Sequence, residues 1–293
     1  TGKGSHMYEP VYKFGDILTG RVDKDLEYVA AKVVDKNGNY IFNGKSDIDI
    51  DGKIWAEESF NIDTQNKKLN VNYKNRDNAI AAIELNSSNL MGLKPVDVNI
   101  DASDININIL TEGAITGILV RNDNLDTSSN LVINGDVNMF AKSLGKMGSN
   151  LSAAGIEVRN NSTMTLNGDI TIKGTDPKDP WGIINTGHTN PGISTTVGIL
   201  AQRFNDDAVG GVVNINGNVD LAIKGCGIVT YGDTAEINVK GGTILVDKDY
   251  SFFEDVSGKE YAKVFALGAR GGTVNMNVED VDGKLVGSNN KVN

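Results

Sequence analysis

Two short patterns alternate along this chain, and their recurrence constrains the fold more than any other feature of the sequence. The first is a strand, an Asn-Gly step and a second strand, with copies at residues 131–139, 164–172 and 213–221 and relatives at 48–54 and 236–244. The second is a small residue followed by Gly-Ile-x-Val or a close variant, with glycines at Gly117, Gly155, Gly198, Gly227 and Gly268. These glycines lie 38, 43, 29 and 41 residues apart. Units of this size that vary by insertion predict stacked coils with loops of different lengths.

The strands within these units are predicted from the alternation of apolar and polar residues. Residues 104–109 read Asp-Ile-Asn-Ile-Asn-Ile, and residues 274–278 read Val-Asn-Met-Asn-Val. Such alternation is typical of strands with one buried face. Helical periodicity is nearly absent, so the sequence predicts an all-β protein.

The Asn-Gly step between two strands has two structural interpretations. It is a strong hairpin signal, which would favour an antiparallel β-sandwich. In a parallel coil the same pair turns a corner, because Asn and Gly both tolerate positive φ. The Gly-Ile-x-Val copies recur between the Asn-Gly steps at separations too long for tight turns. We therefore predict a right-handed parallel β-helix, with stacked inward aliphatics and ladders of Asn or Thr, and keep the β-sandwich as the alternative.

The chain is expected to divide into three regions. Residues 1–7 are typical of an expression-tag remnant. Residues 8–45 are expected to form a β-rich N-terminal segment or cap. Residues 46–293 are expected to form the coils, with loop insertions near 140–153, 174–196 and 247–262. Because no signal peptide is present and no run approaches the ~20 apolar residues of a membrane span, we expect the chain to be part of a longer protein.

Charge and cysteine content exclude several classes of function. The formal net charge is −10, and the acidic residues are scattered. Nucleic acids and anionic membrane surfaces both attract basic faces, so neither is an expected partner. The single cysteine, Cys226, cannot form an internal disulfide and is predicted to be a small buried strand residue.

The Asn-Gly-x-[Val/Ile]-x-[Ile/Leu] steps, the low cysteine content and the turns rich in Asn, Asp, Gly and Thr resemble the passenger domains of bacterial autotransporter adhesins over residues 46–293. The resemblance implies a right-handed β-helical stalk, export to the bacterial cell surface, and anchoring in the outer membrane within the full-length protein. It also implies attachment to host cell-surface glycans or proteins, or self-association of bacterial cells. It carries over no catalytic residue. A passive stalk or spacer is the alternative without binding.

One segment matches the pattern of a calcium-binding EF-hand loop. Its carboxylates are Asp47, Asp49, Asp51 and Glu58. EF-hand loops lie between helices, whereas the flanking residues here favour turns and strands. The alternating isoleucines Ile48 and Ile50 also fall on inward positions, which places the aspartates outside. Calcium is the one cofactor that the sequence suggests, and outward strand carboxylates are the simpler interpretation.

The long insertions are the predicted binding sites, because they hold the only local concentrations of aromatic residues in the chain. The candidates are Trp181, His188, Tyr250, Phe252, Phe253 and Tyr261. Exposed rings can stack on sugar faces or anchor a protein partner. His188 follows a glycine, as in some β-helical polysaccharide hydrolases, but lacks the paired aspartates of those enzymes and is interpreted as a solvated loop residue.

A β-helical polysaccharide lyase or hydrolase is the enzymatic alternative. Arg121 and Arg159 follow equivalent Gly-Ile-x-Val steps and would lie on one outer face, near Asp123 and Glu157. A lyase would use such a basic residue with calcium-binding carboxylates to acidify a uronate proton. A solvated ladder of charge pairs explains the same residues more simply, so no catalytic residue is predicted.

Overall fold

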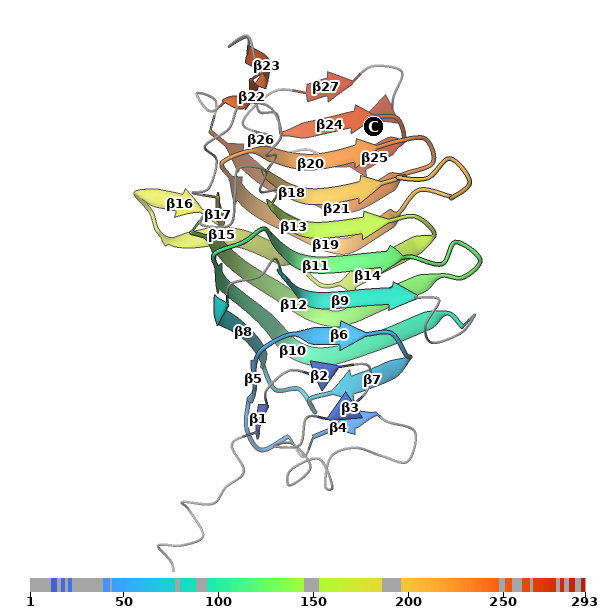
Figure 1. The fold of residues 1–293 in the computed structure, drawn as a ribbon. Helices are drawn as coiled ribbons and strands as arrows, with labels where there is room; N and C mark the ends of the chain where they lie inside the picture. Colours follow the sequence, from blue (N-terminus) through green and yellow to red (C-terminus); the bar gives the residue numbers. More distant parts are fainter. Residues whose placement is uncertain are drawn as a thin grey trace, which may run out of the picture.

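The computed structural model shows a right-handed parallel β-helix, as the repeats predict (Figure 1). In Figure 1 the front strands point to the right, the chain returns behind them, and the colours rise from blue to red, which is a right-handed path. No helix occurs in the part of the chain that the structure describes. The described residues are 12–14, 17–18, 21–22, 39–42, 44–76, 80–87, 94–144, 153–185, 196–247, 251–254, 260–263, 266–277, 280–281, 285–287 and 291–292.

Two long sheets build the helix. The main path of sheet A contains β1 (Tyr12–Phe14), β5 (Ile48–Asp51), β8 (Leu69–Arg76), β10 (Val96–Thr111), β12 (Ser129–Ser143), β14 (Ser162–Asn167), β19 (Val212–Ile223), β21 (Glu236–Val246), β25 (Thr273–Met276) and β28 (Lys291–Val292). Its side strands are β4 (Tyr40–Ile41), β7 (Phe60–Asp63), β15 (Ile170–Asp176), β16 (Asp179–Trp181), β17 (Ile183–Asn185) and β26 (Asp280–Val281).

Sheet B lies on the side that faces the viewer in Figure 1. It contains β2 (Ile17–Leu18), β3 (Arg21–Val22), β6 (Ile54–Ala56), β9 (Ile80–Ser87), β11 (Ile115–Asn122), β13 (Ala153–Arg159), β18 (Thr196–Gln202), β20 (Cys226–Tyr231), β24 (Leu267–Arg270) and β27 (Leu285–Gly287). A separate two-stranded sheet pairs β22 (Ser251–Glu254) with β23 (Glu260–Lys263). Strands of successive coils pair in parallel, which rules out the antiparallel β-sandwich.

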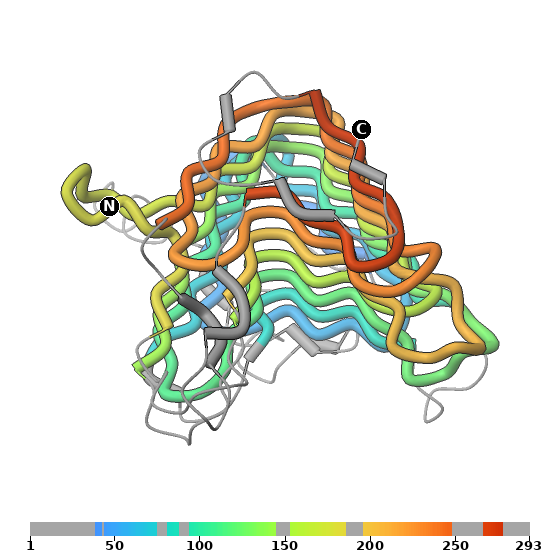
Figure 2. Tube along the Cα trace, turned by 90° about the horizontal axis from the view of Figure 1, so that it is seen from above, coloured from blue at the N-terminus to red at the C-terminus, as the bar shows by residue number. Residues whose placement is uncertain are grey.

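Each complete coil has three sides, which give the stack a triangular outline from above (Figure 2). Sheet B forms one side, and sheet A bends to form the other two. The bend appears as a register shift between Asp101 and Asp104 in the β10–β12 pair, and between Ile215 and Asn218 in the β19–β21 pair. We call this bend the apex. The turn from sheet B into sheet A is the B–A corner, and the turn from sheet A back into sheet B is the A–B corner.

The Asn-Gly steps turn the apex rather than forming hairpins, which confirms the prediction for the coil. The first half of β12, through Asn134, pairs with β14, and its second half, from Val137, pairs with β15. A Cβ atom added to Gly168 would lie 2.2 Å from the carbonyl oxygen of Gly135, so side chains are excluded here by the neighbouring coil. The Asp51-Gly52 relative is different, because it connects β5 to β6 at the A–B corner.

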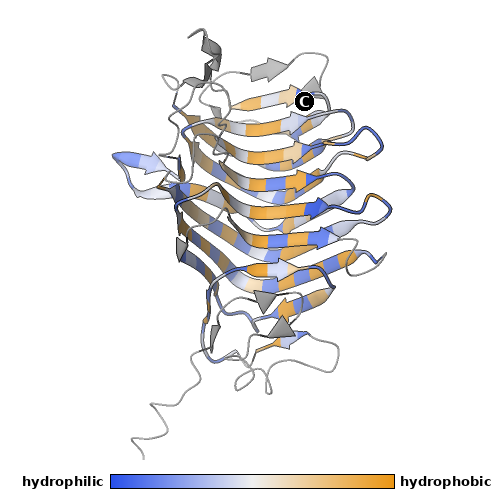
Figure 3. Cartoon of the chain, viewed as in Figure 1, coloured by the Kyte–Doolittle hydropathy of each residue, from blue (hydrophilic) through white to orange (hydrophobic). Residues whose placement is uncertain are grey.

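The core consists of vertical columns of aliphatic side chains, which appear as orange bands alternating with polar ones along the strands (Figure 3). One column crosses sheet B and every member is completely buried: Ile54, Ile83, Ile118, Ile156, Ile199, Ile228 and Leu267. Burying an aliphatic side chain of this size stabilises the folded state by roughly 1.5–3 kcal/mol. The repeat therefore persists because each coil supplies the apolar partner for the next.

A column of small residues lies beside these isoleucines and explains the Gly-Ile-x-Val pattern. A Cβ atom added to Gly155 would lie 2.6 Å from the carbonyl oxygen of Gly198 and 2.6 Å from Cδ1 of Ile172. The prediction for Gly268, the last glycine of the series, is wrong, because this residue does not lie in the small-residue column. Gly268 pairs with Val229, and Ala266 occupies the small-residue position next to Gly227, because Ile228 aligns with Leu267.

Asparagine ladders run along the outside of sheet A, as the stacked-coil prediction requires. At the apex, Nδ2 of Asn167 donates to Oδ1 of Asn134 at 2.7 Å, and Nδ2 of Asn216 donates to Oδ1 of Asn167 at 2.8 Å. A second ladder joins Asp49, Asn70, Asn106 and Asn138, and a third joins Asn214, Asn238 and Asn275. Each rung satisfies polar groups on adjacent coils and fixes their register.

The long insertions emerge at the A–B corner. Residues 140–143, at the start of the first predicted insertion, belong to β12, and residues 145–152 lie outside the described part. The second insertion begins with an ordered hairpin of β15 and β16, which projects to the left in Figures 1 and 2. The third contains the β22–β23 hairpin. The predicted N-terminal segment adds β1, β2 and β4 to the edges of the same two sheets.

Candidate functional site

The four candidate calcium ligands lie on strands and turns of the first described coil. Asp49 points outward from β5, and its Oδ1 accepts a hydrogen bond of 2.8 Å from Nδ2 of Asn70. Oδ1 of Asp47 accepts from the backbone N–H of Lys68 at 3.0 Å. Asp51 and Glu58 are exposed, at the end of β5 and in the turn after β6. Within the described residues no three Asp, Glu, His or Cys side chains are grouped so as to hold a metal ion. Calcium binding here stays a prediction of the sequence.

The predicted aromatic binding residues are only partly placed. Trp181 is half-buried at the end of β16, opposite Lys173 of β15. His188 and Tyr250 lie outside the described residues. Phe252, Phe253 and Tyr261 lie on the β22–β23 hairpin, of which only the backbone is described. Trp181 and this hairpin both belong to insertions of the A–B corner.

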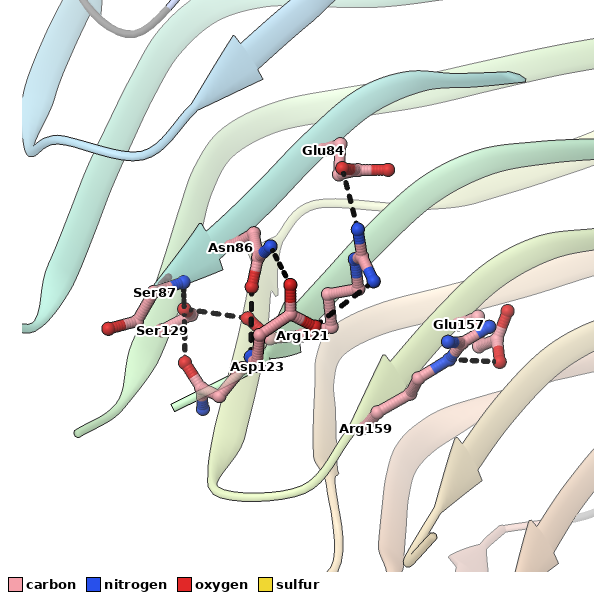
Figure 4. A network of polar contacts seen from close by, with 9 residues as sticks. Glu84, Asn86, Ser87, Arg121, Asp123, Ser129, Glu157 and Arg159 are labelled. Atoms are coloured by element: carbon pink, nitrogen blue, oxygen red, sulfur yellow. Dashed lines mark hydrogen bonds and ion pairs between the residues drawn. The ribbon is translucent and has the colours of Figure 1, made fainter. Parts of the chain in front are cut away.

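Arg121 and Arg159 occupy one outer column of sheet B, as predicted, and each has carboxylate partners (Figure 4). Arg121 contacts Oε2 of Glu84 at 3.5 Å and Oδ1 of Asp123 at 3.2 Å. Nε of Arg159 donates to Oε1 of Glu157 at 2.6 Å. These arginines are about 30% exposed, so each pair contributes little stability, typically ~0.2–1 kcal/mol before further screening by salt. Cys226 is buried, as predicted.

A surface that the sequence did not predict lies at the B–A corner, opposite the hairpin in Figure 2. Residues 203–211 connect β18 to β19 and carry Phe204 and Val209, which are 60% and 58% exposed. Tyr231 ends β20 on the next coil and is 48% exposed. The backbone N–H of Arg203 donates to the carbonyl oxygen of Tyr231 at 2.8 Å, which fixes the loop beside that strand.

Two asparagines of the preceding coil hold this loop in place. Oδ1 of Asn160 accepts from the backbone N–H of Phe204 at 2.7 Å, and Oδ1 of Asn161 accepts from that of Val209 at 2.9 Å. Asn161 has a φ of +54° and also donates through Nδ2 to the carbonyl oxygen of Leu125, one coil further down. The loop is therefore fixed at both of its exposed apolar residues.

The Phe204 ring packs on the guanidinium of Arg159. The guanidinium carbon of Arg159 lies 4.8 Å from the ring centroid, and the same guanidinium donates to Glu157. Nε2 of Gln202 also donates to Glu157, so one carboxylate holds side chains from two coils. A cation–π contact of this kind contributes about 0.5–1 kcal/mol at an exposed site. It orients the ring while leaving most of its surface in solvent.

Exposed carboxylates occur in the loops of the same corner. Asp206 and Asp207 lie in the same loop, Asp233 lies two residues after Tyr231, and Asp126 lies in the corner loop two coils below. None of these four carboxylates forms an ion pair with another described residue. We call Phe204, Val209, Tyr231, Asp126, Asp206, Asp207 and Asp233 together the corner surface.

One signal for the corner surface was present in the sequence. The turn between the Gly-Ile-x-Val strand and the next strand comprises residues 160–161 in one coil and residues 203–211 in the next. This difference in length marks an insertion. Its composition, with a single ring among Arg, Asn and Asp, shows no concentration of aromatic residues, and the pairing with Tyr231 depends on the coil register.

The fold and this surface define the chain as a β-helical solenoid with ordered loops projecting from its corners. Comparison with protein-family models, with curated proteins and with solved structures found no match for this chain. Among the described residues no helix is long and apolar enough to cross a membrane.

Proposed function

We propose that this chain is the binding region of a bacterial cell-surface adhesin and that it attaches to its partner through the corner surface. The observation that carries the proposal is the concentration of exposed apolar side chains there. Among the described residues five large apolar side chains are exposed, and three of them are Phe204, Val209 and Tyr231. Exposed apolar groups gathered at one place and rimmed by polar residues are typical of interaction sites.

The rigidity of the loop supports binding rather than a passive spacer. Ordering a loop costs conformational entropy, about 1–2 kcal/mol for each backbone residue. Here Asn160 and Asn161 order the loop of residues 203–211, while the side chains of Phe204 and Val209 in that loop stay exposed to solvent. A preorganised apolar surface lowers the entropy cost of binding a partner. A spacer gains nothing from this arrangement.

The corner surface is a better supported site than the hairpin at the opposite corner. Trp181 is half-buried, whereas Phe204 is more than half exposed. The arginines that a lyase would use are bound to Glu84, Asp123 and Glu157. The described geometry therefore favours attachment over polysaccharide cleavage.

Attachment assays on the displayed chain test this proposal. The chain is displayed on a non-adherent bacterium, and attachment to cultured epithelial cells and autoaggregation are both measured. The double variant Phe204→Ala/Tyr231→Ala is expected to lose about tenfold or more of the activity that the wild type shows, because aromatic anchors dominate interface energies. Its circular dichroism spectrum should be unchanged, since neither side chain is part of the buried core.

The matched control removes two exposed apolar side chains elsewhere. Ile41 and Leu144 are 45% and 40% exposed and lie away from the B–A corner. Ile41→Ala/Leu144→Ala should attach like the wild type. If both double variants attach and aggregate equally well, the corner surface is not the binding site.

A further inference from the structure

The charged groups of the corner surface indicate which charge a complementary partner would carry. The loops at this corner, residues 123–128, 203–211 and 232–235, contain five aspartates and one arginine. The guanidinium of that arginine, Arg203, donates to the carbonyl oxygens of Asp206 and Ala208, which holds its positive charge against the loop backbone. Asp123 is paired with Arg121. Four aspartates therefore keep carboxylates without an ion-pair partner among the described residues.

The nearby cations reduce this acidic character but do not cancel it, because Arg203 and Arg270 stand against those four aspartates. Arg159 lies under the Phe204 ring and is bound to Glu157. Arg270 is exposed on the coil above, in register with Tyr231, and forms one edge of the surface. Asp206 and Asp207 lie in the same loop as Phe204, and Asp233 lies two residues after Tyr231; all three are exposed. A partner therefore meets carboxylates and ring faces together.

We infer that the corner surface binds a basic segment of a partner protein, whose Lys or Arg side chains pair with Asp206, Asp207 and Asp233 while its apolar or cationic groups pack on Phe204 and Tyr231. This inference rests on the proposed adhesive function and names the partner chemistry of the same site. Ring faces attract ammonium and guanidinium groups, and carboxylates beside them add charge complementarity.

The same charges disfavour the other partners. Acidic glycans would meet carboxylates of like sign. A second copy of this chain also carries a net charge of −10, and docking through its own corner surface would bring two acidic rims together. A neutral glycan can stack on the rings, but its binding would not depend on the aspartates.

Peptide binding to the complete chain tests the inference. The probes are two synthetic peptides of equal length, one alternating Lys and Arg with Leu and Gly, the other carrying Glu in place of every Lys and Arg. The basic peptide should bind about tenfold or more tightly than the acidic one, and its affinity should fall as NaCl rises from about 50 to about 300 mM. A neutral glucose oligosaccharide serves as the third probe and should not bind.

Matched variants separate this site from general charge attraction. Asp206→Asn/Asp207→Asn/Asp233→Asn should weaken the basic peptide about tenfold and flatten its salt dependence. Phe204→Ala should weaken it about fivefold or more. Asp176→Asn/Asp179→Asn changes two exposed aspartates on the hairpin at the A–B corner and should have no effect.

The outcomes are decisive and separable from those of the attachment assay. Equal affinity for the two peptides, equal loss in the hairpin variant, or tighter binding of the neutral oligosaccharide would overturn the inference. If the Phe204→Ala/Tyr231→Ala variant loses attachment while the peptides fail to discriminate, the adhesive function stands and the partner chemistry is wrong. If attachment is unaffected but the peptides discriminate as expected, the site binds basic segments for another purpose.

Discussion

At the scale of single residues, the outer ladders have a direction. In each ladder, Nδ2 of an asparagine donates toward the preceding coil, and its Oδ1 faces the following one. The first member of two ladders is an aspartate, Asp49 or Asp101. This position only has to accept a hydrogen bond from the asparagine of the following coil, and a carboxylate does so. An aspartate at an inner rung would face a carbonyl oxygen instead of donating to it. This asymmetry explains why inner rungs are Asn.

Tyr40 offers a test of burial at this scale. Its side chain is completely buried in the first described coil, packs edge-on against Phe60, and its hydroxyl has no hydrogen-bond partner among the described residues. Burial raises the pKa of Tyr40 to about 12. Because the neutral phenol is favoured in the folded state, its stabilising contribution is complete below pH 10 and is lost as the pH rises from 10 to about 12.

The variant Tyr40→Phe is therefore expected to differ from the wild type in two ways. At neutral pH it should be equally stable or more stable by up to ~1 kcal/mol, since an unpaired buried hydroxyl is removed. Between pH 10 and pH 12 the wild type should lose about 2 kcal/mol more than the variant. Urea unfolding at a series of pH values measures both. Parallel loss in the two proteins would show that Tyr40 ionises as freely as an exposed tyrosine.

At the scale of elements, the hairpin of residues 174–182 is an excursion that leaves the coil and returns to the same point. Ile172 aligns with Met139 and Leu221, and Ile183 aligns with Ala141 and Ile223. In each neighbouring strand a single residue, Phe140 or Ala222, lies between the two aligned positions. Joining Lys173 directly to Ile183 would therefore restore an uninterrupted strand in register with both neighbours.

Deletion of residues 174–182 tests this alignment and also the hairpin as a binding site. The shortened chain is expected to fold with its thermal midpoint within a few degrees of the wild type, because repeat folds tolerate loop changes outside the stacked core. Attachment through the corner surface should be retained. A deletion variant that folds but no longer attaches would show that the binding site includes Trp181 and its hairpin.

The repeat predicts the coil path well because the residues that define it are periodic. Asn134, Gly155 and Ile156 belong to columns, so each is repeated at a readable interval. The prediction failed where a column tolerates another residue, as at Ala266, which takes the place expected for a glycine. The corner surface escaped prediction for a different reason. Phe204 and Tyr231 come to the same corner on adjacent coils through the coil register, and neither residue recurs along the sequence.

At the scale of the whole molecule, stacking converts separations along the chain into contacts in space. Arg159, Gln202 and Tyr231 lie on three successive coils and occupy one outer column of sheet B. The corner surface exists only if this column is in register, because its residues come from three different turns of the helix. Its position relative to the hairpin is fixed in the same way, by the triangular coil that places them at different corners (Figure 2).

Cysteine cross-linking across two coils measures this register most directly. In a Cys226→Ala background, Gln202→Cys/Tyr231→Cys places thiols on paired strands about 5 Å apart, within the Cα separation of a disulfide. Gln202→Cys/Arg270→Cys places them two coils apart, about 10 Å, which is too far. Mild oxidation followed by mass spectrometry should find the intramolecular disulfide in the first protein and free thiols in the second. Free thiols in the first protein, or equal cross-linking in both, would contradict the stacked coils that form the corner surface.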